Sequence, residues 1–167
     1  MSKVFIYGFE PFRDYSSNCT QAIIDNLPLS VDYQALVLPV RFEKDIFLEP
    51  IKRYQPDYIL GLGQYPWGGK IRIERRAFNW QRESRRELGE AIDPLLEQTR
   101  NVNWKISPNS RSRVTYDAGR YVCNFSSWTC LDWALREGRK SAFLHVPRDY
   151  PLQDGVAFIQ YVLATME

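Results

Sequence analysis

The chain has 167 residues, of which 44% are hydrophobic and 25% charged, and a formal net charge of +2 at pH 7. This size and composition predict one globular domain over residues 1–167 with a full hydrophobic core. The net charge is too small to argue by itself for a nucleic-acid partner, and none is expected. No apolar run approaches the ~20 residues that cross a bilayer, so no membrane partner is expected.

The first half of the chain alternates buried strands with helices. Strands are predicted at 3–7, 33–40 and 57–62, and helices at 20–27 and 42–54. Asn18 or Ser17 is the expected N-cap of the first helix, and Pro39 marks the end or an edge position of the second strand. Pro50 interrupts the otherwise helical spacing of the second helix.

The second half begins with an alternating pattern, Ile71 and Ile73 against Arg72 and Glu74, which predicts a strand with one polar face. The charged segment that follows predicts elements less clearly. We expect a helix at 87–98, an extended stretch at 102–106, a turn at 117–119, a helix at 123–137, a strand at 141–146 and a closing amphipathic helix at 152–166.

Alternating strands and helices predict an α/β protein, a three-layer α/β/α sandwich around a mostly parallel or mixed twisted sheet. In such sheets, reactive groups gather in the loops outside the carboxyl ends of the strands. Three places fit this description: the loop GFEPF at 8–12, the loop GQYPWGG at 63–69, and His145 at the end of the last strand.

Two residues are candidates for nucleophilic chemistry. His145 is the only histidine, so it is the one available imidazole base, although a strand-end histidine also fits a hydrogen-bonded core residue. Cys123 lies in the first turn of a predicted helix, where backbone N–H groups and the helix dipole favour a thiolate and stabilise an oxyanion. A buried structural thiol is the alternative for Cys123, and Cys130 on the same helical face is interpreted as core.

Glu74 is the candidate third member of this set, because it lies on the polar face of its strand. A thiolate paired with an imidazole that a carboxylate orients is the minimal apparatus for acyl transfer. Taken alone, Glu74 fits equally well an ion pair with Arg72, Arg75 or Arg76. The spacing of the cysteines is not that of a zinc site, so no metal is predicted.

The cysteine count and the N-terminus bear on the compartment. Three cysteines leave one unpaired, which excludes a full disulfide framework. MSKVFIYGFEPF lacks an apolar signal core followed by a small-residue cleavage site. We therefore expect a cytoplasmic protein with reduced thiols, in which a thiol nucleophile stays available.

Five motifs, taken together, resemble the pyroglutamyl peptidase I family of cysteine peptidases. They are GFEPF at 8–12, LPV at 38–40, the G-Q…IERRAFN run at 63–79, AGRYVCN at 118–124 and FLHVP at 143–147. They occur in the order of the family and cover most of the chain. The resemblance implies Cys123 as nucleophile, His145 as general base and acid, and Glu74 as the group that orients the imidazole.

The resemblance also implies the reaction, which is removal of an N-terminal pyroglutamyl residue from peptides through a thioester acyl-enzyme, without metal or cofactor. In the family, the two phenylalanines of GFEPF sandwich the lactam ring, and here these positions are Phe9 and Phe12. Ordinary loop packing is the alternative for both. Gln64 falls where a family loop residue lies near the pocket, and the backbone N–H of Cys123 is a natural oxyanion donor.

The chain departs from the family after Asn79, where WQRESRRELGEAIDP replaces a segment whose arginine helps line the oxyanion site. Arg85 is the expected substitute for that arginine, and Arg82 is the next choice. The chain is shorter than typical members, which often assemble as tetramers, so a homo-oligomer is left open.

Two further functions stay open: a hydrolase with the same triad and another acyl substrate, and a non-catalytic binding protein that retains the pocket.

Overall fold

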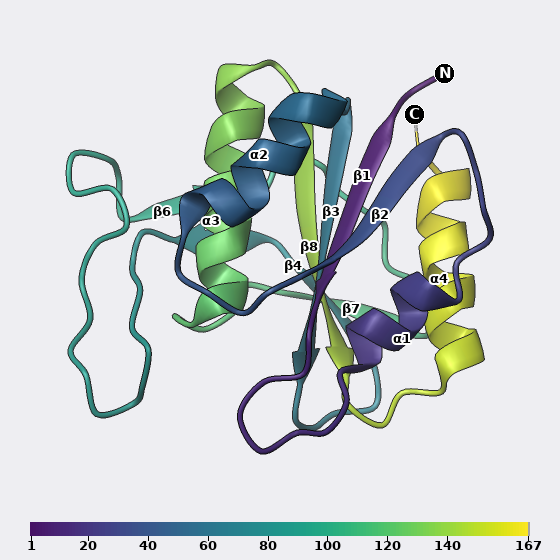
Figure 1. The fold of residues 1–167 in the computed structure, drawn as a ribbon, viewed down its shortest axis with the longest axis horizontal. Helices are drawn as coiled ribbons and strands as arrows, with labels where there is room; N and C mark the ends of the chain where they lie inside the picture. Colours follow the sequence, from purple (N-terminus) through teal and green to yellow (C-terminus); the bar gives the residue numbers. More distant parts are fainter. Residues whose placement is uncertain (167) are drawn as a thin grey trace.

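The computed structural model describes residues 1–166, in which helices cover both faces of a central sheet (Figure 1). The strands of this sheet are β1 (Val4–Phe9), β2 (Tyr33–Leu38), β3 (Tyr58–Tyr65), β4 (Ile71–Glu74), β7 (Ser112–Thr115) and β8 (Lys140–Pro147). The helices are α1 (Cys19–Asp25), α2 (Lys44–Tyr54), α3 (Val122–Arg136) and α4 (Leu152–Ala164). The predicted three-layer α/β sandwich is confirmed.

The sheet has the strand order β2-β1-β3-β8-β4-β7. The first four strands of this order run parallel, whereas β4 pairs antiparallel with β8 and parallel with β7. The sheet is therefore mixed and mostly parallel. Its topology brings β3, β8, β4 and β7 side by side, and these strands carry Gly63, His145, Glu74 and Thr115 of the site described below.

Each face of the sheet has its own apolar core, because the strands alternate their side chains between the two helical layers. On one face, Ile23 of α1 and Ile159 of α4 pack against the strands. On the other, Phe47 of α2 and Trp128 of α3 are fully buried. Figure 1 shows the same division, with α2 and α3 on one side of the sheet and α1 and α4 on the other. Helix α3 is thereby fixed against the central strands.

The predicted helix at 87–98 is wrong. Residues 81–98 form a loop with turns that leads into a small second sheet of β5 (Arg76–Phe78) and β6 (Thr99–Asn101). Two of its apolar residues, Leu88 and Leu95, are 92% and 99% exposed, whereas Ile92 and Leu96 pack into the core from a loop conformation. The apolar residues of the segment therefore do not share one buried helical face that would stabilise a helix. Gly89 also adopts a left-handed conformation with a φ of +81°.

Other boundaries differ from the expectations in smaller ways. The alternating run after residue 70 is divided into β4 and β5, and the edge strand β7 was not predicted. Pro50 lies inside α2 and does not end it. The first helix is capped by Asn18, whose side chain accepts a hydrogen bond from the backbone N–H of Thr20, as one of the two predicted caps. No helix in residues 1–166 has the length and apolarity needed to span a bilayer.

Candidate active site

Cys123 is the second residue of α3, and its position is set by the residue that follows it. Asn124 is fully buried, and its side chain exchanges two hydrogen bonds of 2.8 Å with the backbone N–H and C=O of Phe78 in β5. The first turn of α3 is thereby clamped to the neighbouring chain. Tyr121, the N-cap of α3, offers no side-chain hydrogen bond to this turn. The N–H groups at the start of α3 are therefore available to a ligand.

Thr115, Glu74 and His145 form a hydrogen-bonded chain across β7, β4 and β8. Nδ1 of His145 lies 2.9 Å from Oε1 of Glu74, and the hydroxyl of Thr115 donates to Oε2 of Glu74 at 2.8 Å. Glu74 is only 1% exposed, and Thr115 is its register partner between β4 and β7. Because both carboxylate oxygens are engaged, the imidazole is held with Nδ1 on Glu74 and its Nε2 edge turned away from it.

Cys123 and His145 meet above Gly63 of β3, the register partner of His145. A Cβ atom at Gly63 would lie 2.6 Å from Sγ of Cys123 and 3.0 Å from Cδ2 of His145, the ring carbon bonded to Nε2. Burial lowers the pKa of His145, but the hydrogen bonds and charges of Cys123 and Glu74 outweigh it and raise this pKa to about 9. The ring is therefore protonated near neutral pH.

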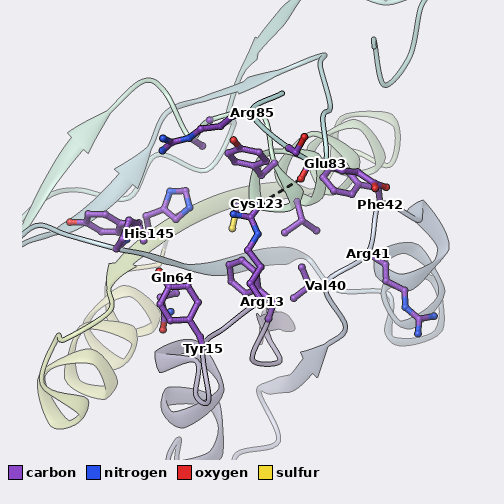
Figure 2. Close-up of a pocket in the computed structure, with 18 of the residues that line it drawn as sticks. Arg13, Tyr15, Val40, Arg41, Phe42, Gln64, Glu83, Arg85, Cys123 and His145 are labelled. Atoms are coloured by element: carbon purple, nitrogen blue, oxygen red, sulfur yellow. Dashed lines mark hydrogen bonds between the residues drawn. The ribbon is translucent and has the colours of Figure 1, made fainter. Parts of the chain in front are cut away.

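A cavity of about 1270 Å³ opens at this pair (Figure 2). Its wall holds apolar and aromatic side chains, several arginines, and the Cys123–His145 pair. Among the residues expected to bind substrate, Phe12, Gln64 and Arg85 line this cavity. Glu74 lies behind His145, out of contact with the cavity.

Phe9 is not among the residues that line the cavity. It is the last residue of β1, is 2% exposed, and packs against Tyr7 and Phe47 with ring centroids 5.8 and 6.1 Å apart. The alternation along β1 turns its side chain into the core beneath α2, and Phe12 alone of the two phenylalanines reaches the wall. There Phe12 pairs with Tyr15 at a centroid distance of 5.9 Å.

Gln64 and Arg85 differ in how firmly they are held. The side-chain oxygen of Gln64 accepts a hydrogen bond of 2.8 Å from the backbone N–H of Cys19, at the start of α1, so Gln64 also anchors that helix. Arg85 lies on the exposed loop, and Figure 2 shows its side chain at the rim of the cavity. Arg82, the other candidate, is half-buried and stacks on Tyr121 at 5.7 Å.

Sequence reasoning missed three side chains at this site. Arg72 could have been found, because the alternation of its strand places it on the same face as Glu74. Thr115 gave no signal, since β7 was not predicted. Arg13 follows directly after GFEPF and lines the cavity from a left-handed backbone conformation, with a φ of 55°.

A thiol at a helix N-terminus, an imidazole beside it and a carboxylate behind the imidazole form the constellation that nucleophilic hydrolases use for acyl transfer. Here an α/β sandwich carries that constellation at the floor of an open cavity. Within residues 1–166, no three His, Cys, Asp or Glu side chains gather closely enough to hold a metal ion.

Comparison with known proteins gives the same class. The family model described as pyroglutamyl peptidase matches residues 2–99. A pyrrolidone-carboxylate peptidase of Saccharolobus islandicus is 29% identical over 86% of this chain and 78% of its own length, and one of Halalkalibacterium halodurans is 28% identical over 86% and 83%. The chain belongs to the pyroglutamyl peptidase family.

Solved structures agree with the fold. The pyrrolidone carboxyl peptidase of Thermococcus litoralis superposes with a TM-score of 0.85 and 22% identity, over 98% of this chain and 92% of that one. Pyroglutamyl peptidase I of Bacillus amyloliquefaciens gives a TM-score of 0.84 at 22% identity, over 98% and 95%.

Proposed function

We propose that this chain is a cysteine exopeptidase that removes an N-terminal pyroglutamyl residue from peptides. The observation that carries the proposal is the geometry of His145, which bonds Glu74 through Nδ1 and faces Cys123 across Gly63. Family membership supports the reaction, since the relatives are pyrrolidone-carboxylate peptidases. Cys123 is the proposed nucleophile, His145 the general acid and base, and Glu74 the positioning group.

In the first step, the thiolate of Cys123 attacks the carbonyl carbon that joins pyroglutamate to the next residue, and an S–C bond forms. The carbonyl oxygen becomes an oxyanion, which the free N–H groups at the start of α3 stabilise together with the positive end of the helix dipole. Among these donors, the backbone N–H of Cys123 belongs to the same residue as the attacking sulfur. The rigidity of this turn, clamped by Asn124, keeps these donors in place.

In the second step, the C–N bond breaks and protonated His145 gives its proton to the departing amine, leaving a thioester on Cys123. A water molecule then attacks the thioester carbon while the neutral His145 accepts its proton. The C–S bond breaks, pyroglutamate leaves, and the thiolate of Cys123 is restored beside protonated His145. Glu74 holds the ring in one orientation throughout, stabilises its protonated form, and keeps the remaining proton on Nδ1 when the ring is neutral. Thr115 restrains the second oxygen of Glu74 and so keeps the carboxylate in this orientation.

The wall of the cavity supports a lactam as the bound group. Pyroglutamate is an uncharged five-membered ring, which fits an apolar wall with a few polar groups. Phe12, Tyr15 and Phe42 supply apolar surface, and Gln64 supplies an amide. Because the pyroglutamyl nitrogen carries no charge, no carboxylate is needed to receive a free amino terminus.

The test is hydrolysis of a fluorogenic pyroglutamyl amide by the wild type and by Cys123→Ala. We expect turnover by the wild type and its loss in the variant, with unfolding curves showing that both proteins are folded. A folded wild type without turnover, or a variant that keeps full activity, contradicts the proposal.

The buried position of Phe9 favours one alternative, a hydrolase with the same triad and another acyl group, because the expected two-sided clamp on the lactam is incomplete. Assay of a panel of N-blocked and free aminoacyl amides separates the two. Turnover confined to pyroglutamyl compounds excludes the alternative. The rate at which iodoacetamide alkylates Cys123 at neutral pH, compared with that of free cysteine, likewise distinguishes an activated thiol from the ordinary thiol expected of a binding protein.

A further inference from the structure

The cavity beside Cys123 and His145 has more cationic than acidic side chains in its wall. Five arginines line it, namely Arg13, Arg41, Arg72, Arg85 and Arg86, against three acidic residues, Glu43, Glu83 and Asp117. The chain as a whole carries a formal charge of only +2, so positive charge is concentrated at this cavity. Concave walls of one sign focus the electrostatic field on a bound ligand.

These arginines lack carboxylate partners. Within residues 1–166, none of the five forms an ion pair, whereas the acidic Asp117 is already engaged by Arg120, which does not line the cavity. Arg41 extends away from Cys123, as Figure 2 shows, and Arg85 and Arg86 lie on the exposed loop. Arg13 and Arg72 are the two whose guanidinium groups are held by contacts of their own.

Arg72 is anchored next to the proposed general acid. It is the register partner of His145 between β4 and β8, which places both side chains on one face of the sheet. Its guanidinium stacks on the ring of Tyr65 at 4.3 Å, and its buried Nε has no hydrogen-bond partner within residues 1–166. Stacking occupies the face of a guanidinium and leaves its in-plane N–H donors free for a planar anion.

Arg13 is anchored close to the start of the helix that carries the nucleophile. Its guanidinium lies 5.5 Å from the ring of Tyr121, two residues before Cys123, and donates to the backbone oxygen of Glu83 at 3.4 Å. Figure 2 shows this side chain reaching across the cavity from its loop toward Glu83. A non-glycine residue at a φ of 55° costs conformational energy, which tertiary contacts must offset.

Resting on the proposed function, we infer that this cavity selects peptides with a carboxylate on the leaving-group side of the scissile bond, and that Arg13 and Arg72 are its specificity-determining residues. The pyroglutamyl ring is uncharged, so it gives these guanidinium groups no anion to bind. The carboxylate has two sources. It is the side chain of an acidic residue after pyroglutamate, or the C-terminus of a pyroglutamyl dipeptide. A guanidinium binds either one through paired N–H donors.

The experiment compares kcat/KM for three substrates: pyroglutamyl-glutamate amide, pyroglutamyl-glutamine amide, and pyroglutamyl-glutamine with a free C-terminus. Glutamate and glutamine are nearly isosteric, so the comparison of the glutamate amide with the glutamine amide isolates the charge of the side chain. The comparison of the glutamine amide with the glutamine compound that has a free C-terminus isolates the terminal carboxylate. We expect the wild type to prefer one or both acids by about tenfold over the neutral amide at low ionic strength, with the preference shrinking as salt is added.

Arg13→Gln and Arg72→Gln identify the groups responsible. Each is expected to bring the acid-to-amide ratio of kcat/KM toward one. Arg53→Gln is the matched control, because Arg53 is an exposed residue of α2 outside the cavity, and it removes the same charge from the chain. The ratio in this control should equal that of the wild type. A wild-type ratio near one, or an equal loss in Arg53→Gln, overturns the inference.

Binding to Cys123→Ala keeps this result separate from the fate of the proposed function. Calorimetric titration of that variant with the same compounds reports on the arginines without turnover. Equal affinity for acid and amide overturns the inference, even if the wild type cleaves both. Tighter binding of the acids by Cys123→Ala, with no cleavage by the wild type, supports the inference about the arginines and overturns only the catalytic proposal.

Discussion

At the scale of single residues, Cys123 and Glu74 together raise the pKa of His145 against the effect of burial, and this gives a prediction in pH. The pKa of His145 is about 9, so at lower pH this residue carries the proton that the departing amine needs. We therefore expect kcat/KM to fall as pH rises through about 9. Glu74→Gln removes one of the charges that raise this pKa. In this variant the fall of kcat/KM at high pH should therefore occur at a lower pH than in the wild type, and kcat/KM at pH 7 should be roughly a hundredfold lower.

The profile is measured as kcat/KM between pH 6 and 10.5 for both proteins. Glu49→Gln, at an exposed glutamate of α2, is the control for the loss of one negative charge and should keep the wild-type profile. If kcat/KM falls at the same high pH in Glu74→Gln as in the wild type, then Glu74 does not raise the pKa of His145.

Gly63 gives a second residue-scale prediction, because its lack of a side chain leaves the space in which Cys123 and His145 approach each other. In Gly63→Ala the new methyl group would lie 2.6 Å from Sγ of Cys123 and 2.8 Å from Cζ of Phe143, so the reacting pair must shift. A displacement near 1 Å costs about a hundredfold in rate, so we expect a loss of that order in kcat in a protein that still folds.

Gly69→Ala is the matched control, since a Cβ there meets no atom within 4 Å. It should keep wild-type activity and wild-type thermal unfolding. Retention of full activity by Gly63→Ala would show that the thiol and imidazole do not depend on this close approach.

At the scale of elements, the loop at 81–98 is held by Asn79, the last residue of the IERRAFN motif. Its side chain accepts from the backbone N–H of Asp93 and donates to the backbone oxygen of the same residue, both at 2.7 Å, with further bonds to the oxygens of Leu96 and Glu97. Asp93 in turn accepts a hydrogen bond from the buried Trp128 of α3 at 2.7 Å. The loop that carries Glu83 and the exposed arginines is thus tied to the catalytic helix.

Asn79→Ala should lower the free energy of unfolding by about 2–3 kcal/mol, because it removes four hydrogen bonds from a nearly buried side chain to partly buried backbone groups. Urea denaturation measures this loss, and proteolysis should cut the variant first within 81–98. Asn101→Ala, at an exposed position of β6, should stay within about 0.5 kcal/mol of the wild type. A stable Asn79→Ala protein would mean that the loop is held by other contacts.

At the scale of the whole molecule, the raised pKa of His145 links folding to pH. A group that is more basic in the folded chain than in the unfolded one stabilises the fold fully below its unfolded pKa of ~6.5. That contribution disappears as pH rises through the folded value of about 9. The free energy of unfolding from urea titrations should therefore decline between these two pH values.

The thiols of Cys19 and Cys130 add to the same decline at higher pH, because burial raises the pKa of each to about 12. His145→Gln isolates the histidine, since both cysteines remain in that variant. The difference in free energy of unfolding between the wild type and His145→Gln should narrow as pH rises through about 9. A gap that does not depend on pH would contradict the coupling of His145 to Cys123 and Glu74.

Much of the fold could be predicted from local pattern. The apolar runs of β1, β3 and β8 and the stripe of α3 bury their side chains almost completely, so hydrophobicity and period identify them. The segment at 81–98 misled the same reasoning, because its helical spacing of apolar residues does not correspond to one buried face: Ile92 and Leu96 pack into the core, but Leu88 and Leu95 are exposed. Its loop conformation depends on the side chain of Asn79 and the indole of Trp128, which local pattern cannot report.

The sequence by itself determined the chemistry available to this protein: one histidine, a cysteine at the start of a helix, a glutamate on the polar face of a strand, and motifs that resemble one family. Only the tertiary structure decided how these groups combine. Strand register sets Glu74 and Gly63 beside His145, Phe9 turns into the core while Phe12 reaches the wall, and Arg13 and Arg72 join one cavity. The physical reason is that contacts between residues distant in the chain follow from sheet pairing and packing, which no local period encodes.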